Sequence, residues 1–152
     1  MLENVIENKN FALMMKRHIG ELVVHFFEQE QNFGILCKVD DVQFEPALPE
    51  SIKSEFRSLT LFFLAGYTFE TARIDDDFII FEAGFGADNF GSLVSVPLLS
   101  IMQVIVDETP VLINLARYIH EPVVEKEVDE NGVKNSMDVF LSNPENSKFL
   151  KK

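Results

Sequence analysis

The sequence predicts an α+β fold: a long N-terminal helix, an antiparallel sheet curled into a partial barrel, a short C-terminal helix and a flexible tail. Three observations predict this class. An apolar stripe with helical spacing runs through residues 3–30, and about six strand-like segments follow it. These segments are joined by short connections, which favour antiparallel pairing. Because the chain has 152 residues and no internal repeat, we expect one domain over residues 1–120.

Residues 3–30 are expected to form one long helix. Its apolar side chains recur at intervals of three and four, at Ala12, Met15, Ile19, Leu22 and Phe26, and therefore share one stripe of the helix surface. A long helix cannot bury its whole stripe against one sheet of a small domain, and two-fold dimers are the commonest assembly. We therefore expect a homodimer with Met15, Ile19, Leu22 and Phe26 in its interface.

The middle of the chain predicts strands, at residues 35–39, 42–44, 59–64, 67–74, 78–85 and 93–96. Residues 50–58 predict a short helix or a loop, and Asp75-Asp76-Asp77 predicts a turn. Pro97 ends the last of these strands, because proline cannot continue a central ladder. Residues 98–106 are then expected to be helical. Residues 109–120 predict either another short helix, capped by Thr109-Pro110, or a strand over 111–115.

Composition and charge exclude several classes of partner. The formal net charge of −12 repels nucleic-acid phosphates and anionic lipid heads. The N-terminus carries an acid where a signal peptide needs bases, and no apolar run reaches the roughly 18 residues of a membrane span. The single cysteine, Cys37, cannot form an intrachain disulfide. We therefore expect a cytoplasmic protein without nucleic-acid or membrane partners, with residues 121–152 as a flexible, acidic tail.

The glycines at 84, 86 and 91 do not predict a nucleotide site. Their spacing is G-x-G-x-x-x-x-G, but they precede a strand, whereas a phosphate loop of this kind needs a helix N-terminus behind it. Cys37 has no basic partner that would make it a nucleophile. We therefore expect no catalytic residue and no cofactor, with an unrecognised catalytic cleft as the alternative.

Two other groups of residues do not predict a metal site. His18 and His25 are seven positions apart on the predicted helix, about 10 Å, and Leu22 between them cannot ligate. Asp75-Asp76-Asp77 lacks the alternating oxygen ligands and the following glutamate of a calcium loop. We expect surface histidines and a charged turn.

A resemblance to a known family lies within residues 78–106. The chain has Phe81-Glu82-Ala83-Gly84-Phe85-Gly86, a short loop, then Leu93-Val94-Ser95-Val96-Pro97-Leu98 and an apolar segment ending near Val106. This order resembles SspB, the family of adaptors that deliver tagged proteins to the ClpXP protease, which carries F-x-A-x-F-G, a loop, V-S-V-P-L and an apolar helix. Upstream elements agree in order, so the similarity extends over residues 10–120.

The resemblance implies a dimer joined through the N-terminal helix and a half-open barrel whose groove accepts an extended peptide degron. It also implies an acidic tail whose last residues dock on the ClpX unfoldase. Phe149, Leu150, Lys151 and Lys152 are the candidate docking residues, although they do not match the usual ending of the family. Gly84 stands where the family often has arginine, which weakens the expectation of the same acidic tag.

The candidate peptide-binding residues lie on two neighbouring predicted strands. A strand in a groove offers main-chain hydrogen bonds to an extended peptide, and alternate side chains form pockets. On this basis the candidates are Ile79, Phe81, Ala83, Phe85, Val94 and Val96. Packing inside the protein's own core is an equally good interpretation of each.

The leading hypothesis is an adaptor that captures the peptide tag of a client protein and tethers it to a AAA+ unfoldase, with no enzymatic activity of its own. The alternative is a small acidic chaperone of the secretion type, which holds an unfolded client segment and needs no terminal docking motif.

Overall fold

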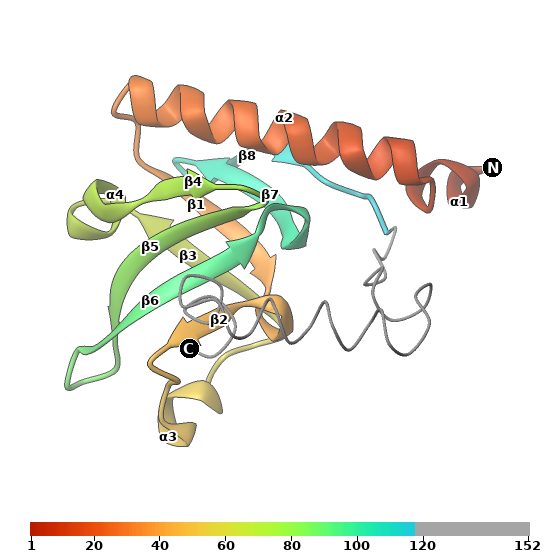
Figure 1. The fold of residues 1–152 in the computed structure, drawn as a ribbon. Helices are drawn as coiled ribbons and strands as arrows, with labels where there is room; N and C mark the ends of the chain where they lie inside the picture. Colours follow the sequence, from red (N-terminus) through yellow and green to blue (C-terminus); the bar gives the residue numbers. More distant parts are fainter. Residues whose placement is uncertain (118–152) are drawn as a thin grey trace, which may run out of the picture. The chain divides into compact units, whose positions relative to one another are not determined.

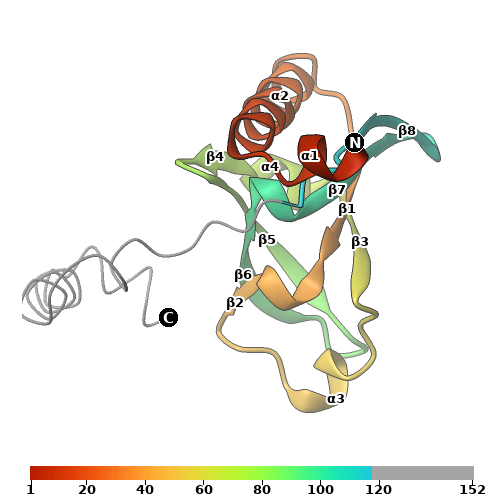
Figure 2. The ribbon, with the colours of Figure 1, turned by 90° about the vertical axis from the view of Figure 1, so that its right-hand side faces the viewer.

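The computed structural model describes residues 1–117. It is a mixed α+β fold with one long helix and two four-stranded antiparallel sheets (Figures 1 and 2). Within this described part, no helix combines the length and apolarity that crossing a membrane would require. The predicted tail and the candidate docking residues Phe149, Leu150, Lys151 and Lys152 lie outside the described residues.

The N-terminal segment forms two helices, α1 (Leu2–Ile6) and α2 (Lys9–Glu28), where one was expected. The break lies at Asn8, whose backbone is extended and whose side-chain oxygen accepts a hydrogen bond from the Phe11 N–H at 3.0 Å. Asparagine is a favoured N-cap because its side chain satisfies one of the free N–H groups of the first turn. The long helix α2 lies along one side of the sheets (Figure 1).

The first sheet has the strand order β3-β1-β7-β8. Its strands are β1 (Phe33–Lys38), β3 (Leu59–Leu64), β7 (Ile101–Val106) and β8 (Thr109–Ile113). The second sheet has the order β2-β6-β5-β4. Its strands are β2 (Gln43–Glu45), β4 (Arg73–Asp75), β5 (Phe78–Phe85) and β6 (Phe90–Pro97). The two sheets do not close into a barrel.

Four one-turn helices connect the strands: η1 (Val39–Asp41), α3 (Glu50–Lys53), α4 (Tyr67–Thr71) and η2 (Leu98–Ser100).

The predicted short C-terminal helix is wrong. Residues 98–106 form η2 followed by β7, and the strand alternative holds in the next segment, where β8 occupies residues 109–113. The reason is tertiary pairing: β7 is hydrogen-bonded to β1 on one side and to β8 on the other. Asp107 and Glu108 both have positive φ, 50° and 69°, the backbone of a two-residue hairpin turn.

The expected strand at 67–74 is also wrong in its first half. Residues 67–71 form α4, which begins after Gly66 at φ 60°, and only β4 is extended. The Asp76-Asp77 turn that follows is as expected, and Lys16 makes a salt bridge with Asp77 at 3.0 Å.

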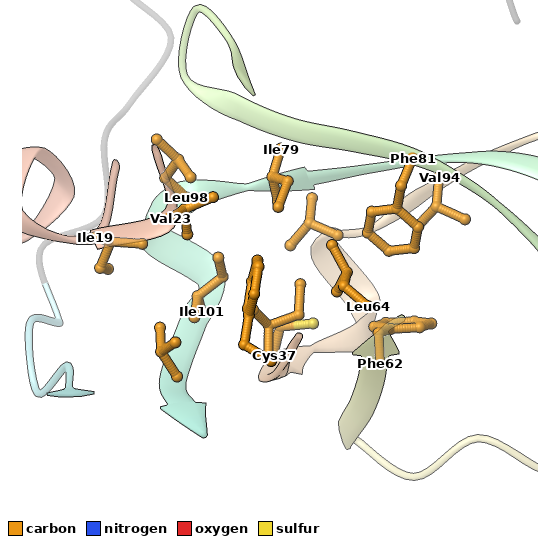
Figure 3. Close-up of a cluster of buried hydrophobic side chains, with 14 of the residues drawn as sticks. Ile19, Val23, Cys37, Phe62, Leu64, Ile79, Phe81, Val94, Leu98 and Ile101 are labelled. Carbon is orange, nitrogen blue, oxygen red and sulfur yellow. The ribbon is translucent and has the colours of Figure 1, made fainter. Parts of the chain in front are cut away.

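The core lies between the inner faces of the two sheets and α2 (Figure 3). Fully buried side chains come from all three layers, among them Ile19, Val23, Phe33, Ile35, Phe81, Val94 and Ile101. Four phenylalanines close one end of this core, at 44, 56, 62 and 85, with ring centroids 5.7–6.4 Å apart.

Candidate functional site

The predicted peptide-binding residues lie mostly in the core. Ile79, Phe81, Val94 and Val96 have no exposed surface, so their side chains cannot form pockets for a visiting peptide. Figure 3 shows the first three of them among the core side chains. The prediction is wrong for these four, because the first sheet covers the face they share. Ala83 and Phe85 are partly buried against the same core.

The predicted dimer residues on α2 also face inward. Ile19 is fully buried, and Leu22 and Phe26 pack against the core cluster. A second subunit therefore cannot reach Ile19, which corrects that part of the prediction. Met15 is partly buried. The apolar side chains that α2 exposes are Leu13, Met14 and Val24.

The opposite face of the β5–β6 hairpin is open. Glu45, Leu93 and Glu82 form a cross-strand row over β2, β6 and β5, since Leu93 is paired with both glutamates. Successive side chains of a strand alternate between faces, so this row points away from Phe81 and Val94. A hollow of about 860 Å³ lies here. It is lined by residues 82–84 and 91–93 with Glu45, Ala65, Tyr67, Thr68 and Asn89.

The edge of β5 beside this hollow is only partly paired. The short strand β4 pairs with Phe78–Ile80 and then ends. Beyond it, Thr71 of α4 accepts the Glu82 N–H through its Oγ1 at 2.9 Å. The main-chain groups of Glu82 therefore point away from β6, and those of Gly84, two residues on, point the same way. Within residues 1–117 these Gly84 groups make no hydrogen bond, so one N–H and one C=O are open beside the hollow.

Asn89 occupies the space above Gly84. A Cβ atom added at Gly84 would lie 1.8 Å from the Asn89 Oδ1, so a larger residue there must displace the amide. Asn89 has a φ of 54° and donates its N–H to the Gly86 carbonyl at 3.1 Å. The absence of a side chain at Gly84 thus lets the polar Asn89 amide lie over this strand, next to the open main chain.

The charged residues of the hollow are both acidic. Among its lining residues, Glu45 and Glu82 are the only ionisable carboxylates, and no lysine, arginine or histidine is present. The Tyr67 hydroxyl donates to Glu82 Oε1 at 2.5 Å, and this hydrogen bond raises the pKa of Tyr67. The phenol therefore remains a donor at neutral pH and orients the carboxylate.

Other candidate chemistry does not assemble in the described residues. Within residues 1–117, no three side chains of His, Cys, Asp or Glu gather as metal ligands would. His18 and His25 are exposed on α2. Burial, with a smaller contribution from the Asp41 carboxylate, raises the pKa of Cys37 to about 12, so the thiol is protonated and unreactive at neutral pH.

Sequence reasoning missed Glu45, Tyr67 and Asn89 as site residues. It named Glu82 only within the resemblance, and Gly84 there and in the rejected nucleotide loop. The alternation of β5 contains the signal, because Glu82 and Gly84 alternate with Phe81 and Phe85. Tyr67 gave no such signal, since it belongs to a segment expected to be a strand. Comparisons with protein-family models, with curated proteins and with solved structures found no match.

Proposed function

We propose that the protein binds an extended segment of another polypeptide along the free edge of β5 and acts as an adaptor that brings this client to a AAA+ protease of the ClpXP kind. The observation that carries the proposal is the open main chain of Gly84 beside the hollow. Strand addition at a sheet edge takes its affinity from main-chain hydrogen bonds and its specificity from the side chains around them.

The dimensions support a short peptide. The part of β5 that β4 leaves unpaired runs from Phe81 to Phe85, and a strand rises about 3.3 Å per residue. Because Thr71 already accepts the Glu82 N–H, the free edge accommodates about three residues of an extended chain. A hollow of about 860 Å³ lies within the usual range of ligand sites, roughly 300–1,000 Å³.

The adaptor role draws support from the sequence resemblance. The motif residues 81–86 and 93–98 lie on β5, β6 and the turns that follow them, and the same two strands border the hollow. The elements that resemble SspB adaptors are therefore the elements that offer the peptide site.

A proline at position 84 tests strand addition directly. Because the Gly84 N–H faces away from β6, proline removes a donor for the peptide without breaking the β5–β6 ladder. The variant should also carry Asn89→Gly, since a Cβ at 84 collides with Asn89 and glycine accepts the positive φ at 89. The matched control is Gly84→Ala with Asn89→Gly, which adds the Cβ but keeps the N–H.

Binding is measured by fluorescence anisotropy with a panel of degron-like peptides, and the bound residues are mapped by amide NMR shifts. One lost hydrogen bond contributes about 0.5–1.5 kcal/mol, so the proline variant should bind about 2- to 12-fold more weakly than its alanine control. Shifts should centre on residues 82–84 and 91–93. Equal affinity of the two variants would contradict strand addition at Gly84, and the absence of binding by every peptide would contradict the proposed function.

A further inference from the structure

The charges of the hollow indicate which peptides it accepts. We infer that the hollow selects extended segments that carry lysine or arginine and rejects acidic segments. This inference rests on the proposed peptide site. Three features carry this inference: the position of two carboxylates, their lack of a cationic partner, and the apolar side chain of Leu93 between them.

Glu45 and Glu82 flank Leu93 in the cross-strand row. Neighbouring strands are about 4.8 Å apart, so the two backbone positions are separated by about 10 Å. Both residues line the hollow. A cation above Leu93 would therefore lie within reach of both carboxylates.

Neither carboxylate is neutralised within residues 1–117. The salt bridge of the described part joins Lys16 to Asp77, and neither of these residues lines the hollow. Glu82 has a neutral partner, the Tyr67 hydroxyl, which fixes one oxygen and leaves the other free. Glu45 makes no side-chain hydrogen bond in this part of the chain. An anionic peptide would bring a further negative charge to this unneutralised pair.

The floor of the hollow suits a long basic side chain. Gly84 and Gly91 are paired across β5 and β6 and contribute no side chains of their own beside Leu93, and the Asn89 amide lies over Gly84. A peptide strand beside β5 directs alternate side chains over this same face. The aliphatic stem of a lysine or arginine can lie on Leu93 while its head reaches Glu45 and Glu82. The net charge of −12 over the whole chain also attracts cationic segments.

The test uses three ten-residue peptides with one neutral, extended sequence that differ only in two positions, occupied by Lys, Gln or Glu. Their affinities for the full chain are measured by fluorescence anisotropy at low and at high salt. We expect the Lys peptide to bind about tenfold more tightly than the Glu peptide at low salt, as charge-assisted hydrogen bonds require. Tighter or equal binding of the Glu peptide would overturn the inference and leave the peptide site intact.

The matched variants are Glu45→Gln with Glu82→Gln, and Glu70→Gln as the control. Glu70 is exposed on α4 next to the site but does not line the hollow. The double variant should reduce the Lys-over-Glu preference to about twofold, while the control keeps it. An equal loss in the Glu70→Gln variant would assign the preference to overall charge and overturn the inference. Failure of all three peptides to bind, with no NMR shift at 82–84, would instead remove the proposed function itself.

A second, independent observation concerns the outer face of the first sheet. Two cross-strand rows cross all four strands there, Leu61–Leu36–Gln103–Ile113 and Phe63–Gly34–Ile105–Pro110. The side chains at its two edges are strongly exposed: Leu59 45%, Leu61 53% and Phe63 62% on β3, Val111 50% and Ile113 55% on β8. Of the four strands, β3 contacts α4, and Figure 2 shows no described helix lying over the outer face of the sheet.

We propose that a second copy of the chain covers this face. The five strongly exposed apolar side chains, at on the order of 100 Å² each, offer roughly 500 Å², more than half of the ~800 Å² that each partner contributes to a standard interface. The charged residue on this face is Lys38, opposite Leu59 at its margin, so two copies meet there without repulsion between like acidic groups. An apolar patch of this kind is self-complementary in a two-fold dimer.

The test is the oligomeric state of the full chain by analytical ultracentrifugation at about 1–100 μM, the range over which such an interface is expected to assemble. The wild-type protein should be a dimer. The double variant Leu61→Glu with Ile113→Glu should be a monomer, and circular dichroism should show that it remains folded. The control is Leu13→Glu, which places the same charge on an exposed position of α2 and should leave the dimer intact. A monomeric wild type, or a dimer broken by Leu13→Glu but not by the sheet variant, would overturn the proposal.

Discussion

Replacing Phe81 with alanine separates its two interpretations, core residue and peptide contact. Its side chain is fully buried and lies opposite Val94 on β6, and the centroid of its ring is 5.9 Å from the centroid of the Phe62 ring. The next residue, Glu82, is exposed on the other face of the same strand. The two positions are thus neighbours in sequence with opposite environments, and Glu82→Gln is the matched control for stability.

The expected magnitude follows from burial. Truncating a buried phenylalanine to alanine removes its apolar surface from the core and leaves a cavity, at a cost of about 3–5 kcal/mol in the free energy of unfolding. The total free energy of unfolding of a small domain is only about 5–15 kcal/mol. With a urea slope of about 2 kcal/mol per molar, the unfolding midpoint should fall by about 1.5–2.5 M. Glu82→Gln should change stability by less than about 0.5 kcal/mol.

The assay is equilibrium urea unfolding followed by circular dichroism, together with the affinity of the Lys peptide for each folded variant. Phe81→Leu keeps most of the buried volume and should cost only about 1–1.5 kcal/mol, so it allows peptide binding to be measured without loss of the fold. A Phe81→Ala variant within about 1 kcal/mol of wild type, with weakened peptide binding, would refute the assignment of Phe81 to the core.

Three further predictions follow from the structure and the sequence. Cys37 should react with iodoacetamide at pH 8 far more slowly in the native protein than in urea. Because burial raises its pKa from 9.0 to about 12, the stability it contributes is complete below pH 9 and is lost as the pH rises toward 12, a slope that Cys37→Ala should remove. Asn114→Ala should cost about 2–3 kcal/mol in urea unfolding, since the buried amide donates to the carbonyls of Leu99 and Ile101 and accepts the Ala116 N–H. Deleting residues 145–152 should abolish delivery of a tagged client to the protease in a degradation assay while leaving peptide affinity unchanged, and equal degradation would contradict a docking role for the chain end.

Several elements could be predicted because local signals were unambiguous. Aromatic and β-branched residues between the Asp75–Asp77 turn and Gly86 predicted the strand at 78–85, and β5 has these bounds. The 3-4 spacing of apolar residues predicted α2, although Asn8 starts the helix later than expected. Both signals depend on side-chain period and turn chemistry, which act over a few residues.

The segment 98–113 could not be predicted in this way. Its apolar run from Leu98 to Val106 contains only Ser100 and Gln103 as polar residues, so neither a helical nor a strand period stands out. Pairing with β1, which is more than 60 residues earlier in the chain, supplies the main-chain hydrogen bonds that make it β7. The tertiary structure, and not the local sequence, therefore decides that residues 101–106 form a strand.

In the candidate site, too, some features follow from the local sequence and others only from the tertiary structure. The sequence by itself determined that β5 has one apolar face with Phe81 and an opposite face that becomes small and polar at Glu82 and Gly84, because strand side chains alternate. Only the tertiary structure decided which face is covered and where β4 stops, since both depend on strands that pack from distant parts of the chain. A face buried by the first sheet becomes core, and the edge beyond β4 leaves the Gly84 main chain open beside the hollow.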